Sequence, residues 1–129
     1  IDSPGCAYLL NQFALFLGAQ ARFHEAEPLF RRALAISEAA YGVNHPEVAT
    51  SLNNLANLLQ ATNRHAEAEP LFRRALAIDE AAYGENHPTV AIRLNNLADL
   101  LLATSRLAEV AAQRAYVSDW ELNRYFEMI

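Results

Sequence analysis

The tripeptide Asn-His-Pro occurs twice in this chain, beginning at Asn44 and again at Asn86, an interval of 42 residues. The sequence beside it recurs at the same interval, since residues 25–42 match residues 67–84 at every position but one. A period of about 40 residues indicates stacked supersecondary units, because each unit buries its apolar face only against a neighbour. The interval divides the chain into three units, at residues 2–43, 44–85 and 86–127.

Each unit is predicted to hold two helices. The first begins at a proline such as Pro46, whose φ is preset for the first helical position and which needs no N–H there. From there to about Thr62 the apolar residues recur every three or four positions, which is typical of an amphipathic helix. The second helix ends at Gly84, a residue suited to the left-handed position after a helix. Pro28 and Pro70 lie inside the second helices, so we expect a late helix start or a slight kink there.

Small and large residues alternate with the same period. In the second unit they are Leu52, Leu55, Ala56 and Leu59 of the first helix, then Ala68, Phe72 and Ala75 of the second. This alternation resembles the tetratricopeptide repeat, and the motifs NHPxVAxxLNNLAxLL and AEAEPLFRRALAI are similar to its kinesin-light-chain subtype. The resemblance implies an all-α fold, an α-solenoid of antiparallel helix pairs wound as a right-handed superhelix. We expect a single array over residues 1–129, irregular from about residue 110.

Charge and composition narrow the classes of function. The 129 residues carry 15 acidic side chains against ten arginines and no lysine, a net charge of −5. This balance argues against a nucleic-acid partner and favours neutral or basic ones. No run approaches the ~18 apolar residues that a membrane span needs, and no secretory signal is evident. We expect a cytoplasmic protein without membrane contact, and the start at Ile1, on a repeat boundary, suggests a piece of a longer array.

Residues that could carry chemistry have simpler structural interpretations. His45 and His87 recur with the repeat, directly before a helix-opening proline, and no second ligand follows at metal-binding spacing. Asn44 and Asn86, which precede them, are expected as turn or cap residues. Cys6 is the only cysteine, so an internal disulfide or a thiolate cluster is excluded. Since no nucleophile or phosphate-loop motif is present either, we expect no metal, no cofactor and no enzymatic activity.

The first helices carry the candidate binding residues. The resemblance implies that these helices line a concave groove that binds extended or helical peptides. Five of their polar residues fall at four-residue and 42-residue spacings and are predicted to form one polar ladder on that face: Asn11, Asn53, Asn57, Asn95 and Asp99. An asparagine amide both donates and accepts, so it can hold a peptide backbone without requiring charge. Asn54 and Asn96 either share this role or bond across helices within the stack.

Two segments carry unusual apolar surface. The first unit has apolar residues at positions that are mostly polar one repeat later, which suggests that another repeat or another chain covers them: Tyr8, Leu9, Phe13, Leu15 and Phe16. The C-terminal tail departs from the repeat after about Glu109 and restarts a helix near Ser118. Its apolar residues must be covered, and they are expected to contact another molecule: Trp120, Leu122, Tyr125, Phe126 and Ile129. The alternative is that the tail folds back on Leu94, Leu97 and Leu101 of its own chain.

The sequence therefore favours a non-catalytic protein-interaction module that binds a peptide or protein segment in the concave groove. The alternative is a structural module that forms homo-oligomers, through the apolar first unit or the C-terminal tail. The arginine pairs of the second helices, at residues 31–32 and 73–74, are expected on the outer layer beside neighbouring glutamates. A basic stripe for an acidic partner is the other interpretation of these pairs.

Overall fold

The computed structural model describes residues 3–104, which form five α-helices joined by short turns. In chain order the helices are α1 (Pro4–Ala19), α2 (Phe23–Tyr41), α3 (Pro46–Ala61), α4 (His65–Tyr83) and α5 (Pro88–Ala103). The helices that open with proline have 16 residues each, and α2 and α4 have 19 residues each. The periodicity of the sequence is thus carried into the helix boundaries.

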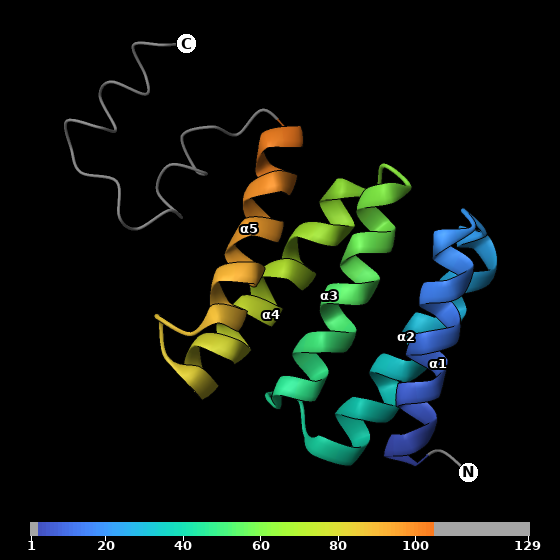
Figure 1. Cartoon of the computed structure of the whole chain (residues 1–129), viewed down its shortest axis with the longest axis horizontal. Helices are drawn as coiled ribbons and strands as arrows, with labels where there is room; N and C mark the ends of the chain where they lie inside the picture. The colour runs from blue at the N-terminus through green and yellow to red at the C-terminus, as the bar shows by residue number, and fades with distance from the viewer. Residues whose placement is uncertain (1–2, 105–129) are drawn as a thin grey trace.

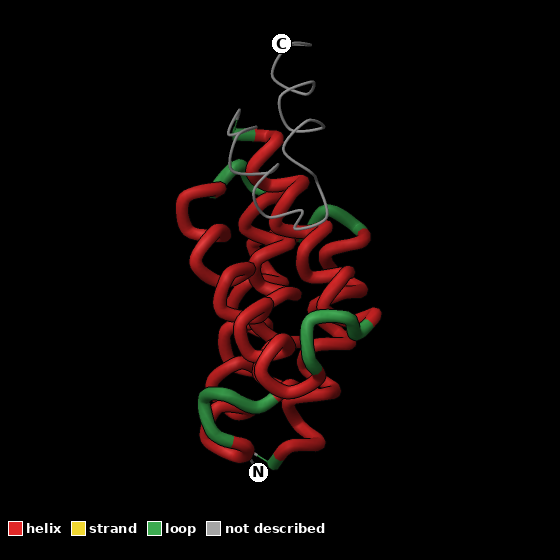
Figure 2. Tube along the Cα trace, turned by 90° about the vertical axis from the view of Figure 1, so that its left-hand side faces the viewer, coloured by secondary structure: helices red, strands yellow, loops and turns green. Residues whose placement is uncertain are grey.

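The helices stack as successive pairs. Helix α1 packs along α2 and α3 packs along α4, while α2 and α4 also contact the first helix of the next pair, α3 and α5. Figure 1 shows the pairs following one another across the molecule, from α1 and α2 to α5. Figure 2 shows the stack from the side, with only helices and short loops in the part that is described. The predicted all-α solenoid is therefore confirmed.

The core lies between the helices of each pair and between neighbouring pairs. On α3 every apolar position predicted for the core is buried, namely Val48, Leu52, Leu55, Ala56, Leu58 and Leu59. On α4 the predicted small and large positions Ala68, Phe72 and Ala75 are buried as well, and Leu71 is partly buried against the core. Ala56 and Ala68 leave room where the helices approach closely, and the ring of Phe72 fills the space beside them.

Histidine side chains cap α3 and α5. The Nδ1 atom of His45 accepts a hydrogen bond from the backbone N–H of Glu47, and that of His87 accepts one from Thr89, both at 3.1 Å. The asparagine before each histidine lies in the turn and is not the cap residue. Each imidazole also stacks on the tyrosine at the end of the preceding helix, with ring centroids 4.6 Å apart in the first pair and 4.4 Å in the second. The recurrence of histidine with the repeat thus has a structural cause.

Replacing His45 by Ala is expected to lower the free energy of unfolding by about 0.5–2 kcal/mol, because the amide of Glu47 loses its acceptor. Urea unfolding measures this change. His45→Asn is the matched control, since asparagine restores a side-chain acceptor at the cap and is expected to recover part of the loss. Asn44→Ala should leave stability nearly unchanged. An equal loss in Asn44→Ala would show that the cap lies elsewhere.

The prolines inside the second helices do not delay their start. Helices α2 and α4 both begin five residues before their proline, at Pro28 and Pro70. The expectation of a late helix start is therefore wrong. A proline in the second turn removes only one backbone hydrogen bond, and the buried face of each helix outweighs that loss. Both helices end before a glycine with positive φ, 89° at Gly42 and 86° at Gly84, a region where a side chain would be strained.

Arg31 of α2 and both arginines of the α4 pair lie beside glutamates, as the sequence predicts. The ion pairs are Arg31 with Glu27, Arg73 with Glu69, and Arg74 with Glu38 of the preceding pair of helices. A hydrogen bond from Arg64 lowers the pKa of the Glu27 carboxyl below its ordinary value. The stabilisation from this pair is complete above the pKa of an unfolded-chain glutamate, and it is lost as the pH falls through the lower pKa of the folded state.

Candidate peptide-binding groove

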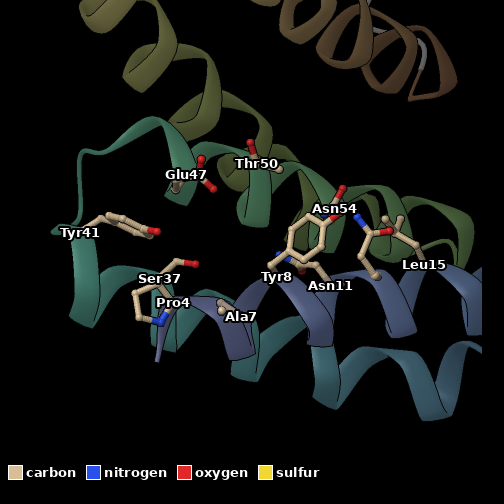
Figure 3. Close-up of a pocket in the computed structure, with 12 residues that line it drawn as sticks. Pro4, Ala7, Tyr8, Asn11, Leu15, Ser37, Tyr41, Glu47, Thr50 and Asn54 are labelled. Carbon is tan, nitrogen blue, oxygen red and sulfur yellow. The ribbon is translucent and has the colours of Figure 1, made fainter. Parts of the chain in front are cut away.

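A groove runs along the junction of α1 and α3, and Figure 3 shows its first section. This section lies between the N-terminal halves of the two helices and has a volume of about 570 Å³. Tyr8 and Asn11 of α1 line it opposite Thr50 and Asn54 of α3, and Tyr41 borders it from the end of α2. The Tyr8 side chain is 64% exposed, so its ring is available to a ligand.

The groove continues between the C-terminal halves of α1 and α3. This second section has a volume of about 280 Å³ and shares two lining residues with the first, Leu15 and Asn54. Phe23 and Leu58 contribute apolar lining, and Asn57 adds an exposed amide. The two sections therefore form one continuous surface along the length of α1 and α3, with a polar half and an apolar half.

A short chain of polar side chains forms the floor of the first section. The amide of Asn11 donates from Nδ2 to the Ser51 hydroxyl at 3.2 Å, and that hydroxyl lies 3.4 Å from the buried hydroxyl of Ser37. The other end of the amide, the Oδ1 atom of Asn11, is buried and has no hydrogen-bond partner within residues 3–104. Such an acceptor favours a ligand that brings an N–H donor into the groove.

A related pocket recurs one repeat later, between α3 and α5, and we call it the α3/α5 pocket. Its volume is about 330 Å³. Its lining residues that matter here are Glu47, Thr50, Asp79, Tyr83, Ile92 and Arg93. Asp79 is 1% exposed, and its Oδ2 atom accepts a hydrogen bond from Arg93 Nε at 2.7 Å. The Asp79 Oδ1 atom is buried and has no partner among the described residues.

The two junctions differ by a matched exchange. Asp79 is the single position at which residues 67–84 depart from residues 25–42, where serine stands instead at Ser37. The residue that faces it changes too, because Arg93 lies 42 residues after Ser51. A buried pair of hydroxyls at the first junction therefore becomes a buried ion pair at the second.

The predicted polar ladder is only partly exposed. Asn11 and Asn57 line the groove, and Asn95 and Asp99 are exposed on α5. Asn53 is 8% exposed, and its Oδ1 atom accepts a hydrogen bond from Asn96 Nδ2 at 2.8 Å, so its amide is used between α3 and α5. This burial corrects the prediction that Asn53 faces the groove. Of the two alternatives for Asn96, the structure shows the bond across helices, from α5 to α3.

Other groove residues were missed from the sequence. The sequence predicts that another repeat or another chain covers Tyr8, and its patterns do not single out Tyr41 or Glu47, yet all three line the groove. The recurrence of tyrosine four residues before each Asn-His-Pro histidine was the available signal. The predicted self-association residues of the tail lie outside the described residues: Trp120, Leu122, Tyr125, Phe126 and Ile129.

Within residues 3–104 no three His, Cys, Asp or Glu side chains gather closely enough to hold a metal ion. None of the five described helices is both long enough and apolar enough to cross a membrane.

Helix pairs stacked with a 42-residue period, and a groove between their first helices, define the chain as an α-solenoid repeat protein. The chain belongs to the tetratricopeptide repeat family, whose model matches residues 5–81 and, in an overlapping match, residues 52–115. Proteins of this family are generally non-catalytic modules for protein interaction. No curated protein matches the chain by sequence.

Solved structures of kinesin-light-chain-like proteins share the fold. BtubC (BKLC) from P. vanneervenii superposes with a TM-score of 0.74 at 24% identity, over 83% of this chain and 43% of that one. A putative kinesin light chain from Podosopora anserina with nearly identical TPR-like repeats gives a TM-score of 0.75 at 22% identity, over 88% and 55%. This likeness supports the predicted fold, and the chain spans about half the length of these structures.

Proposed function

We propose that the groove between α1 and α3 binds an extended segment of a partner protein. The observation that carries this proposal is the side chain of Asn11, which lines the open groove and whose Oδ1 atom has no hydrogen-bond partner within the described residues. An extended peptide presents a backbone N–H at every second residue along one edge, and such a donor would satisfy this acceptor. The family's general role in protein interaction agrees with a peptide ligand.

The remaining lining suits a peptide of mixed character. Tyr8 and Leu15 offer exposed apolar surface on one wall, and aromatic side chains bury much area at small entropic cost when they become covered. Thr50, Asn54 and Asn57 offer hydroxyl and amide groups on the opposite wall. A bound segment can therefore alternate between apolar contacts to α1 and hydrogen bonds to α3.

Replacing Asn57, which lines the groove, together with Asp99, its equivalent 42 residues later on α5, by Ala is expected to weaken the binding of a segment that extends from the groove onto α5. The expected loss is about tenfold or more, which corresponds to at least about 1.4 kcal/mol. Both side chains are exposed on the first helices, so the melting temperature should stay nearly unchanged. Peptides for this test come from selection of a phage-displayed library of random segments on the full chain. Fluorescence polarisation then measures their affinity.

Glu80→Ala is the control, because it removes an exposed acid from α4 on the other layer and should leave affinity unchanged. Equal weakening in the control would indicate a general effect of charge and not a groove contact. Unfolding of the double variant would show that these side chains are structural, and full affinity in the double variant would remove them from the binding surface.

Self-association is a second candidate function, which one specific observation favours. Leu9, Phe13 and Phe16 of α1 are all more than half exposed, although Leu55 and Leu58, which lie 42 residues after the two phenylalanines, are buried. A second copy of the chain would cover this apolar face. Light scattering of the full chain tests the idea: a dimer that Phe13→Glu dissociates would support it, and a monomer at high concentration would exclude it.

A further inference from the structure

We propose that the α3/α5 pocket receives a positively charged side chain, lysine or arginine, from the protein segment bound in the groove. The inference rests on the proposed function, because Glu47 and Thr50 line both this pocket and the groove between α1 and α3. A segment lying in the groove therefore passes the pocket as it crosses α3. Beyond the proposed function, the inference specifies that one residue of the bound segment is basic and that this residue lies at the α5 end of the groove.

The carboxylate of Asp79 is the group that a cation would meet. Arg93 Nε bonds to its Oδ2 atom at 2.7 Å, while Oδ1 is buried without a partner among residues 3–104. A carboxylate can accept about four hydrogen bonds, so one arginine contact leaves most of this capacity unused. An unbonded charged oxygen in the interior is costly, and a donor that entered the pocket would remove that cost.

The balance of charge in the pocket favours a cation over an anion. The charged side chains that line it are Glu47, Asp79 and Arg93, an excess of one negative charge. The charge of Arg93 is already matched by Asp79, so the carboxylate of Glu47 is the uncompensated one. A ligand carboxylate would meet two acids, whereas an ammonium or guanidinium group would be attracted to both.

The walls of the pocket suit the aliphatic stem of such a side chain. Ile92 is 54% exposed and Tyr83 is 46% exposed, and both line the pocket together with Pro46. Lysine and arginine cover apolar surface with their methylene groups while the charged end stays with polar partners. The pocket volume of about 330 Å³ accommodates a side chain of this size.

The first junction provides an internal comparison. There Ser37 and Ser51 stand in place of Asp79 and Arg93, and neither serine carries a charge. A ligand that spans both junctions therefore meets a buried carboxylate at one end only. Its basic residue would lie toward α5, which places the basic part of the bound segment at that end of the groove.

Selection of a phage-displayed library of random segments of about 12 residues, on the full chain, tests the inference. Peptides selected on the wild-type chain should carry lysine or arginine at one fixed position. Selection on the Asp79→Ser/Arg93→Ser double variant, which copies the first junction and keeps only the carboxylate of Glu47, should weaken this preference and keep the others. Glu47→Gln, an exposed substitution that does not touch the core, should weaken the same preference.

Titration of single peptides then gives the magnitude. Replacing the basic residue by norleucine should reduce affinity for the wild-type chain about tenfold and reduce affinity for the double variant less, because only Glu47 remains there to attract the cation. An acidic residue at that position, no preference for charge, or the same loss in both chains would overturn the inference while leaving the groove as a peptide site. Failure to select any peptide above background would overturn the inference together with the proposed function.

Discussion

Replacing Arg93 by Ser is expected to lower the free energy of unfolding by about 3–5 kcal/mol, because it leaves a buried carboxylate without its charged partner. Asp79 is 1% exposed and the side chain of Arg93 is 11% exposed, so water screens the 2.7 Å contact between them poorly. The change also removes the guanidinium that joins α5 to α4. Urea unfolding followed by circular dichroism measures the loss.

The Asp79→Ser/Arg93→Ser double variant is the matched control, because the chain already contains this arrangement at Ser37 and Ser51. The double variant should recover most of the stability that Arg93→Ser loses, since two hydroxyls can bond to each other without an uncompensated charge. If Arg93→Ser lowers the free energy of unfolding by less than about 1 kcal/mol, the expectation is contradicted, because the ion pair then contributes no more than a pair on the surface does. A double variant no better than the single one would show that Arg93 acts through packing.

The fold could be predicted because its determinants are local and repeated. The apolar spacing from Val48 to Leu59 specifies one buried face of α3, and the same spacing returns in α5. Proline at the start and glycine at the end fix the helix limits within a residue or two, as at Pro46 and Gly84. The internal repeat then specifies how each helix pair meets the next, since identical faces pack in the same way.

The binding residues were harder to predict, because exposure on a first helix depends on its neighbours on both sides. Asn53 and Asn95 are equivalent in sequence, yet Asn53 is buried between α3 and α5 while Asn95 is exposed. The spacing of the asparagines gives their place on the helix but not the crossing geometry that covers one of them. The capping role of His45 was missed for a related reason, since it depends on the angle at which the turn presents the imidazole.

The exchange of Ser37 for Asp79 was visible in the sequence as a single mismatch between two segments. The effect of this exchange could not be predicted from the sequence, because Arg93, the residue that Asp79 contacts, lies on the next helix and in a different part of the repeat. Residues 42 positions apart can be compared directly along the chain, whereas a pair that changes together is recognised only across an interface. The structure shows that this single mismatch accompanies an electrostatic difference between two otherwise similar pockets, a pair of hydroxyls in one and an ion pair in the other.

Replacing Ala56 by Leu is expected to lower the free energy of unfolding by about 1–3 kcal/mol, because three added carbon atoms must enter a closely packed site. Ala56 is completely buried in the core cluster that contains Phe72 and Leu76 of α4. Nearby side chains cannot move aside without leaving their preferred rotamers, so the cost falls on the packing of α3 against α4.

The matched control for Ala56→Leu is Ala77→Leu, which makes the same chemical change at an exposed position of α4. The control should change stability by less than about 0.5 kcal/mol. Thermal and urea unfolding of the three chains give the comparison, and the helical signal before unfolding should be equal in all of them. If Ala56→Leu unfolds together with the wild type, the close helix approach at Ala56 is wrong, and so is the repeat alignment that equates it with Ala98 of α5.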